Sequence, residues 1–322
     1  MGELINIKNL TIEYVTDEDT VYALNGVSIK LNAGQSLGLV GETGAGKTTL
    51  AKGIMRLIPQ PPGKYVSGQV VFEGRDILGI SEKEMRKIRG NQMSMIFQDP
   101  MTSLNPVMTV GEQIMEVVHS HNKCSKEEAY KRALEMLAMV GISAERANEY
   151  PHQFSGGMKQ RVIVAIALAC SPKLLIADEP TTALDVTIQA QVLEMMRNLR
   201  KKFNTAMLLI THDLGVVAQN CDNVAIIYSG EVVEYGDIKE IFKNPKHPYT
   251  IGLFGSIPNL ISKVKRLKPI KGMMPDPTKQ TTGCKFAERC DRCIEKCSKE
   301  KPELIDLGNG HTVSCFLMED VQ

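Results

Sequence analysis

The segment from Gly41 to Thr48 reads Gly-Glu-Thr-Gly-Ala-Gly-Lys-Thr, and residues of these types at this spacing can hold a chain of phosphates. Closely spaced glycines let the backbone wrap tightly, so that its N–H groups can point at phosphate oxygens. Lys47 can reach the β- and γ-phosphates, and the Thr48 hydroxyl can bind Mg²⁺. The segment therefore predicts a nucleotide-binding loop. The residues predicted to contact the nucleotide are Gly41, Thr43, Gly44, Ala45, Gly46, Lys47, Thr48 and Thr49.

The residues on either side of this loop predict the elements that must position it. The apolar run Leu37–Val40 indicates a buried strand, and Thr49–Leu57 indicates a helix. A strand, a glycine-rich loop and a helix in this order form the context that the pattern requires. The helix also adds its positive N-terminal end to the phosphate site. We therefore interpret the segment as a P-loop rather than as a glycine-rich turn with an accidental lysine.

A second group of chemically capable residues follows two apolar strands further along the chain. Leu174–Ala177 is followed by Asp178 and Glu179, and Ala206–Ile210 is followed closely by His212. The carboxyl ends of strands are where α/β sheets place ligand chemistry. Asp178 is suited to hold Mg²⁺, directly or through water. Glu179 is suited to polarise an attacking water, and His212 is a candidate contact to the γ-phosphate.

The remaining pattern predicts an α/β fold with additional antiparallel β and helical parts. Alternating apolar residues predict strands over 4–15 and 21–31 and a hairpin over 224–235. Helical periodicity begins at residue 109 and continues to 170, which predicts a helical subdomain inserted between strands. Capping signals at Ser81 and Ser125 mark the beginnings of two helices.

Composition excludes several classes of function. The net charge is +1, with 38 basic and 37 acidic residues, so no overall field attracts the chain to nucleic acid or anionic lipid. We interpret a local basic run at Lys263, Lys265, Arg266 and Lys268 as solvent-exposed. The first residues lack the pattern of a signal peptide, and no apolar run approaches the roughly 20 residues that cross a bilayer. We expect a cytoplasmic chain that does not span a membrane.

Six motifs occur in the order and spacing of the ATPase subunits of ABC transporters. They are the P-loop, Gln98, Ser155-Gly-Gly157, Asp178-Glu179, Ala183-Leu-Asp185 and His212. The chain resembles this family over about residues 3–255. The resemblance implies a P-loop NTPase fold, an ATPase domain over 1–255, a separate C-terminal region over 256–322, and hydrolysis of ATP with Mg²⁺.

The resemblance also implies a role for each matching residue. Tyr14 stacks on adenine, and Gln98 contacts Mg²⁺ and water and senses the membrane subunit. Ser155, Gly156 and Gly157 form the signature that grips the γ-phosphate held by a partner subunit. The remaining implied roles are Mg²⁺ binding for Thr48 and Asp178, catalysis for Lys47, Gln98 and Glu179 (the base), an interface carboxylate for Asp185 and a switch histidine for His212.

One departure from the family is visible in the signature, which begins Phe154-Ser-Gly-Gly-Met158 rather than Leu-Ser-Gly-Gly-Gln. The backbone cradle is kept and a glutamine side chain is lost, which does not by itself predict loss of activity. In the family, each ATP lies between the P-loop of one subunit and the signature of the other. The resemblance therefore implies a head-to-tail dimer, with an identical or a sister subunit as the partner.

Three C-terminal segments resemble one branch of the family. Pro245–Thr250, Pro269–Pro275 and Gly283–Phe286 are similar to those of dipeptide and oligopeptide importers, a branch that includes nickel importers. The implied partners are permease subunits at the cytoplasmic face of the cell membrane and, indirectly, a peptide-binding protein, but not nucleic acid. Two alternatives stay open, a soluble ABC ATPase of DNA repair or translation and a metal-sensing regulator.

Five of the eight cysteines lie in the last forty residues, at a spacing dense enough for a metal site. This polar segment offers no evident core for free cysteines, so we expect it to fold around a metal. The branch pattern matches Cys284, Cys290, Cys297 and Cys315, with Cys293 as a possible substitute ligand. The four lack paired C-x2-C knuckles, which favours a [4Fe–4S] cluster, with Zn²⁺ as the alternative.

Overall fold

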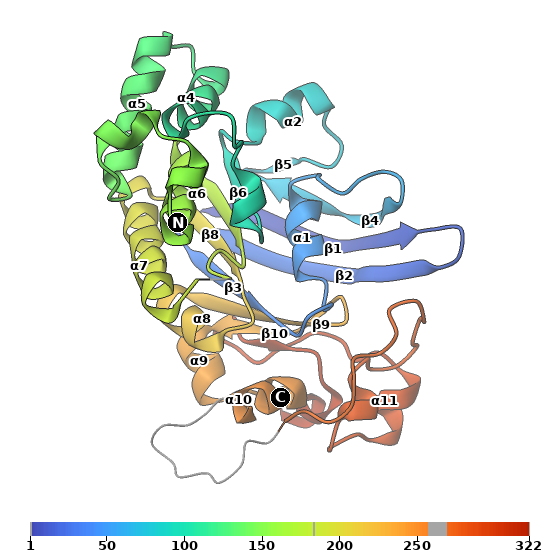
Figure 1. Ribbon diagram of the computed structural model, residues 1–322. Coiled ribbons are helices and arrows are strands. Elements are labelled where there is room, and N and C mark those ends of the chain that lie inside the picture. The colour runs from blue at the N-terminus through green and yellow to red at the C-terminus, as the bar shows by residue number, and fades with distance from the viewer. Residues whose placement is uncertain (1, 183, 257–268, 322) are drawn as a thin grey trace. The chain divides into compact units, whose positions relative to one another are not determined.

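The computed structural model describes residues 2–182, 184–256 and 269–321 (Figure 1). The chain forms two compact units, each built from several segments. The first unit contains residues up to 5, 31–36 and 72–210, and the second contains 6–30, 37–71 and those from 211 onward. The basic run at 263–268 and Ala183 of the predicted motif lie outside the described residues.

The first unit contains three parallel strands in the order β6, β7, β8. These strands are β6 (Met93–Ile96), β7 (Leu174–Asp178) and β8 (Ala206–Ile210). Every residue of β7 and β8 is buried, as expected of parallel strands covered on both faces. Helix α7 (Val186–Phe203) connects them. The strands predicted from the apolar runs are confirmed, and each ends where a polar motif begins.

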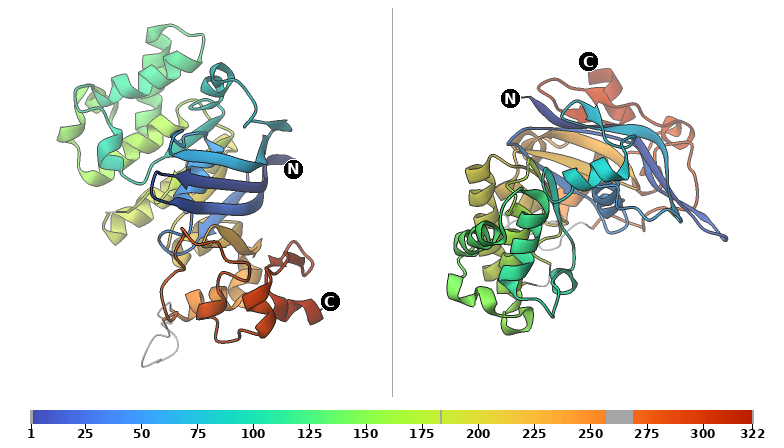
Figure 2. Two further views of the ribbon diagram at one scale, coloured as in Figure 1. Left: turned by 90° about the vertical axis from the view of Figure 1, so that its right-hand side faces the viewer. Right: turned by 90° about the horizontal axis from the view of Figure 1, so that it is seen from above.

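Three longer helices of the first unit lie between β6 and β7 in the chain. They are α4 (Val110–His121), α5 (Lys126–Met139) and α6 (Gly156–Leu168), and both views of Figure 2 show them grouped together. The predicted cap at Ser125 is present, because its side chain accepts a hydrogen bond from the Glu128 N–H. The helical periodicity over 109–170 is thus seen as helices.

The second unit contains a sheet in the order β11, β12, β10, β9, β3. Its strands are β3 (Ser36–Val40), β9 (Asn223–Tyr228), β10 (Glu231–Asp237), β11 (Ile305–Asp306) and β12 (Thr312–Val313). Strand β3 runs parallel to β9, and β9 and β10 form the predicted antiparallel hairpin. Strand β12 pairs antiparallel with β10, so the C-terminal tail continues the sheet.

Three long strands, in the order β2, β1, β4, form most of a further sheet. They are β1 (Glu3–Val15), β2 (Thr20–Asn32) and β4 (Gly63–Phe72). The remaining elements are α1 (Lys47–Ile54), β5 (Arg75–Asp76), α2 (Glu82–Ile88), α3 (Pro100–Ser103), η1 (Ala144–Asn148), η2 (Pro151–Gln153), α8 (Leu214–Asn220), α9 (Ile238–Lys243), α10 (Pro248–Gly255), η3 (Ala287–Arg289), α11 (Glu295–Lys299) and η4 (Phe316–Val321).

Several residues of the tail are buried, so the sequence argument that the segment offers no core for its cysteines is wrong. Phe286, Val313 and Phe316 are buried there, together with Cys297 and Cys315. The few apolar residues of the tail are separated by polar residues, so the sequence pattern did not reveal them. They form a core because β12 pairs with β10. Among the described helices, none combines the length and the apolar character needed to cross a membrane.

Candidate active site

The P-loop lies in the second unit, between β3 and α1. Gly44 and Gly46 have φ values of 84° and 100°, a left-handed conformation that side chains rarely adopt. A Cβ atom at Gly41 would collide with the Ile227 carbonyl oxygen, and one at Gly46 would lie 2.6 Å from the Ala23 carbonyl oxygen. The glycines of the motif are therefore required by the conformation of the loop and by the backbone packed against it.

Lys47 curls back over the loop that precedes it. Its ammonium group donates hydrogen bonds to the carbonyl oxygens of Gly41 (2.8 Å) and Glu42 (3.0 Å), and the residue is only 7% exposed. The positive charge is thus held within the loop by the loop's own backbone. This is the position that a lysine needs in order to meet a phosphate chain wrapped by the same residues.

Two neighbours support the outer side of the P-loop. The Gly230 N–H, in the turn between β9 and β10, donates to the Ala45 carbonyl oxygen at 2.9 Å. The hydroxyl groups of Tyr14 and Thr49 lie 3.4 Å apart, so the predicted adenine-stacking residue stands beside the first turn of α1. Tyr14 is half-buried. The adenine-stacking role itself stays a prediction.

His212 also belongs to the second unit and is exposed. It stands just after β8 and directly before Asp213, which caps helix α8 by accepting hydrogen bonds from the N–H groups of Gly215 (2.7 Å) and Val216 (3.1 Å). The strand end and the helix cap fix the backbone on both sides of His212. The contact of His212 with the γ-phosphate stays a prediction.

The predicted carboxylates lie in the first unit, at the end of β7. Asp178 is buried, and Glu179 has a φ of 46°, an unfavourable value for a residue with a side chain. The Glu179 carboxylate accepts hydrogen bonds from the Thr182 hydroxyl (2.9 Å) and from the Gln98 amide (3.4 Å). The structure thus brings two predicted site residues together, Gln98 and Glu179. Backbone strain of this kind recurs at active sites, where it aims a functional group.

The signature and Asp185 line one open pocket of the first unit. Ser155 caps α6 by accepting a hydrogen bond from the Met158 N–H at 3.4 Å. Asp185 caps α7 in the same way, from the Ile188 N–H at 3.0 Å. Both side chains are exposed. Two motifs separated by thirty residues of sequence therefore meet at the N-terminal ends of two helices, where an anion is stabilised.

The two departures from the family's signature are part of a single cluster. The guanidinium group of Arg146 lies over the ring of Phe154, 4.4 Å from its centroid, and one of its nitrogens lies 3.4 Å from the Met158 sulfur. The Glu149 carboxylate accepts a 2.6 Å hydrogen bond from the same guanidinium group. Phe154 and Met158 therefore share one partner, Arg146.

Comparison with known proteins decides the family. Residues 24–182 match the family described as "ABC transporter", and residues 233–297 match "Oligopeptide/dipeptide transporter, C-terminal region". The Oligopeptide transport ATP-binding protein AppD of Bacillus subtilis is 49% identical, over 99% of this chain and 98% of its own. The Oligopeptide transport ATP-binding protein OppD of Escherichia coli is 46% identical, over 97% of this chain and 93% of its own.

This chain belongs to the ABC transporter family. Solved structures agree with that assignment. The structure entitled "Dimeric structure of a post-hydrolysis state of the ATP-binding cassette MJ0796 bound to ADP and Pi" aligns with a TM-score of 0.65 and 30% identity. The alignment covers 73% of this chain and 98% of the other. The fold is the P-loop ATPase fold of ABC proteins, as expected from the six motifs.

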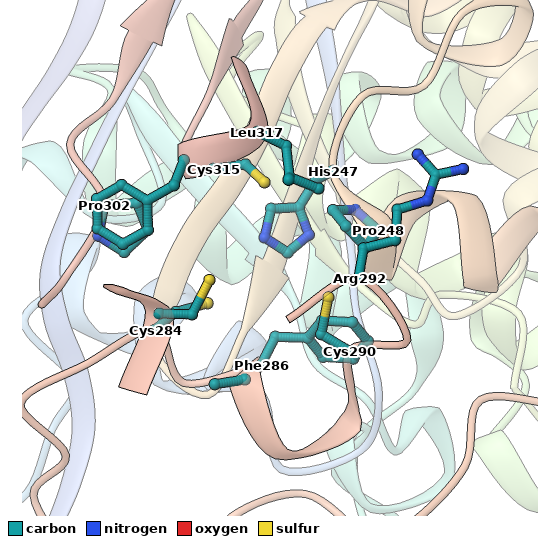
Figure 3. Close-up of a pocket in the computed structure, with 12 residues that line it drawn as sticks. His247, Pro248, Cys284, Phe286, Cys290, Arg292, Pro302, Cys315 and Leu317 are labelled. Carbon is teal, nitrogen blue, oxygen red and sulfur yellow. The ribbon is translucent and has the colours of Figure 1, made fainter. Parts of the chain in front are cut away.

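The C-terminal tail of this ABC protein contains a pocket lined by four of the five predicted cysteines, namely Cys284, Cys290, Cys297 and Cys315. The labelled thiols in Figure 3 surround the ring of His247. The fifth, Cys293, is exposed, and its thiol donates to the Ile294 carbonyl oxygen instead. The four cysteines that line this pocket are thus the same four that the branch pattern matches. His247 is a pocket residue that the sequence did not single out.

The chemistry of this pocket fits thiolate ligation in part. Burial raises the pKa of the Cys284 thiol to about 12 and also raises those of Cys290 and Cys315, so a bound cation would be needed to favour their thiolate forms. Within the described ranges, however, no three His, Cys, Asp or Glu side chains group closely enough to hold a metal ion. The predicted metal-binding region is therefore not supported by ligand geometry.

Proposed function

We propose that this chain is the ATP-hydrolysing subunit that powers import of dipeptides or oligopeptides through a membrane ABC transporter. The observation that carries the proposal is similarity along nearly the whole chain, tail included, to proteins named for oligopeptide and dipeptide transport. Nickel import and a soluble role in DNA repair or translation have no such match among these relatives. The ATPase is peripheral to the membrane, and we assign it to the cytoplasmic face.

Each predicted residue has a task in hydrolysis that suits its position. The P-loop backbone and Lys47 bind the phosphates, and the oxygens of Thr48, Gln98 and Asp178 are the groups suited to Mg²⁺. Mg²⁺, when bound, neutralises charge on the phosphate oxygens. Glu179, oriented by Thr182 and Gln98, accepts the proton of the attacking water. The His212 ring contacts the γ-phosphate.

ATP then lies between two subunits, with the P-loop of one facing the signature of the other. The exposure of Ser155 and Asp185 supports this arrangement, because a surface that completes a partner's site must be open. The similar solved cassettes are described as dimeric. The partner is a second copy or a sister subunit, and permease subunits connect the pair to a peptide-binding protein.

Reconstitution tests the substrate class. The chain is assembled with its permease subunits and binding protein in lipid vesicles, and ATP hydrolysis is followed while peptides or Ni²⁺ are added. Stimulation by short peptides and not by Ni²⁺ is expected. Stimulation by Ni²⁺ alone would show that the chain serves a nickel importer instead. Purification with nucleic acid instead of membrane subunits would contradict the transport role.

We further propose that Cys284, Cys290, Cys297 and Cys315 hold a [4Fe–4S] cluster. Their irregular spacing in the chain favours a cluster over Zn²⁺, and all four line one pocket. When bound, the cluster would cross-link three segments of the tail and withdraw the thiols from oxidation. Cys293 is exposed close by and remains a substitute ligand.

Anaerobic purification with metal analysis tests the cluster. We expect a broad absorption band at about 400 nm and about four irons per chain. The double variant Cys293→Ser/Cys297→Ser should lose this iron, whereas the matched single variant Cys293→Ser should keep it. A colourless protein with one zinc would establish the alternative, and a metal-free protein with an intact fold would leave the thiols as packing residues. If the chain were a metal-sensing regulator, replacing the tail cysteines would change its response to iron or oxidants and not its assembly with partner subunits.

A further inference from the structure

The tail holds the side chain of a P-loop residue. Arg289 donates two hydrogen bonds to the carboxylate of Glu42, at 2.8 and 3.1 Å. The Arg289 side chain is 6% exposed, and its other N–H groups donate to the Tyr228 hydroxyl (3.2 Å) and to the Lys271 carbonyl oxygen (2.9 Å). A two-pronged ion pair of this kind fixes both orientation and charge. The carboxylate of this pair, that of Glu42, belongs to the loop that must hold phosphates.

Helix α10 supports the backbone of the same residue, and the tail packs against that helix. The Glu42 N–H donates to the hydroxyl of Tyr249 at 3.0 Å, and Tyr249 is fully buried. The Tyr249 ring lies 5.4 Å from the ring of Phe286, which itself lines the cysteine pocket of Figure 3. Phe286 and Arg289 both lie in the turn between Cys284 and Cys290. One turn of the tail therefore acts on Glu42 from two sides.

The negative charge of Glu42 is the reason why these contacts affect nucleotide binding. A carboxylate in a phosphate-binding loop repels the ligand, and the repulsion is strong where the surroundings exclude water. The paired guanidinium group neutralises that charge and keeps the carboxylate turned toward the tail. The hydrogen bond to Tyr249 fixes the backbone at the same position. Without the turn, the loop would keep its glycines and Lys47 but would carry an unpaired negative charge.

We propose that the turn from Cys284 to Cys290 positions the ATP site, with Arg289 neutralising and orienting Glu42, and thereby couples nucleotide affinity to the stability of this turn. The proposal rests on the assigned role of the P-loop and extends it to a tail that the six motifs do not include. Coupling of this kind is reciprocal, so ATP must also stabilise the turn. Arg289 is a positioning residue, because it acts through Glu42.

A double-mutant cycle tests the charge argument on the full chain. Arg289→Met is expected to weaken binding of a fluorescent ATP analogue by roughly tenfold, seen in hydrolysis mainly as a higher KM rather than a lower kcat. Arg289→Lys should recover part of the loss, since it keeps the charge without the fork. Adding Glu42→Gln to Arg289→Met should return affinity to within about threefold of wild type, because no unpaired charge remains.

A merely structural role for Arg289 gives a different pattern. Affinity would then fall equally in Arg289→Met and in the double variant, and that result would overturn the proposal. Wild-type affinity in a folded Arg289→Met variant would overturn it as well. Lys47→Ala separates this failure from failure of the P-loop assignment, because that variant loses ATP binding whenever the assignment itself is right.

Two further measurements cover the case in which Arg289→Met disturbs the tail. Tyr249→Phe removes the acceptor of the Glu42 N–H and leaves Arg289 unchanged. This variant should bind the ATP analogue about threefold more weakly. Hydrogen exchange of the wild-type chain should slow over residues 284–297 when the nucleotide analogue binds. Equal exchange with and without the nucleotide would show that tail and site are not coupled.

Discussion

The two parts of the predicted ATP site are held in different ways. In the second unit, the P-loop is supported by residues far away in sequence, with Lys47 buried, Gly230 bonded to Ala45, and Tyr249 and Arg289 bonded to Glu42. In the first unit, the signature and Asp185 are held by helix caps that reach only three residues along the chain. The first arrangement is pre-organised by packing, and the second leaves exposed side chains for a partner.

This difference indicates what each part contributes. A loop held by tertiary contacts can bind nucleotide in an isolated chain, because its N–H groups and lysine are already oriented. A locally capped and exposed surface contributes when a second subunit presents ATP to it. Substitutions in the two parts should therefore be separable, with binding lost in one case and turnover in the other.

Removing the P-loop lysine should have the largest effect. Lys47→Ala deletes the charge held within the loop, so ATP binding and hydrolysis should fall by about a hundredfold or more. Direct binding of a labelled ATP analogue and phosphate release both measure this loss. Arg56→Ala, a change of a cation just beyond α1, is the matched control and should retain turnover. Wild-type hydrolysis by Lys47→Ala would refute the P-loop assignment.

Replacing the predicted base should abolish most hydrolysis of ATP without abolishing ATP binding. Glu179→Gln keeps the shape of the side chain and its contacts but cannot accept a proton, so hydrolysis should fall by about 10²- to 10⁴-fold. ATP should still bind, and a closed dimer should accumulate on gel filtration. Glu194→Gln, at an exposed carboxylate of α7, is the control and should hydrolyse ATP normally. A monomer in the presence of ATP would count against the base role.

Mixing two inactive variants should show that the parts belong to different subunits. Ser155→Arg obstructs the signature and should abolish turnover while the isolated chain still binds ATP. Combined with Lys47→Ala in equal amounts, it should recover about a quarter of wild-type hydrolysis, since half of the dimers then contain one intact site out of two. Mixed dimers that show no recovery would contradict a site shared between subunits.

A purely local change should have the smallest effect. Ser125→Ala removes the N-cap of α5, so the free energy of unfolding should fall by about 1 kcal/mol in a denaturant titration. ATP affinity should stay as in the wild type, because no contact of the P-loop is changed. Ser125→Asp keeps a capping oxygen and should retain stability. A loss of ATP affinity in Ser125→Ala would show that the helical part is not independent of nucleotide binding.

Much of the fold followed from local pattern. Strands that end in Asp178 or near His212, the hairpin at Ser229 and Gly230, and the cap at Ser125 are confirmed, because apolar periodicity and turn chemistry act over a few residues. Short helices such as α8 and α9 were missed, since one or two turns carry too little periodicity to detect. The core of the tail was missed because it depends on pairing of Val313 with Glu234.

The chemically capable residues could be recognised without a structure, namely a phosphate loop, two carboxylates, a glycine-rich helix start and a set of thiols in a family order. These are contiguous motifs, whose backbone requirements are met by neighbouring residues. The contacts of Glu42 with Tyr249 and Arg289, which follow it by 207 and 247 residues, became visible in the folded chain alone. Contacts across such separations depend on how distant segments of the second unit pack together, and no local pattern around Glu42 announces them.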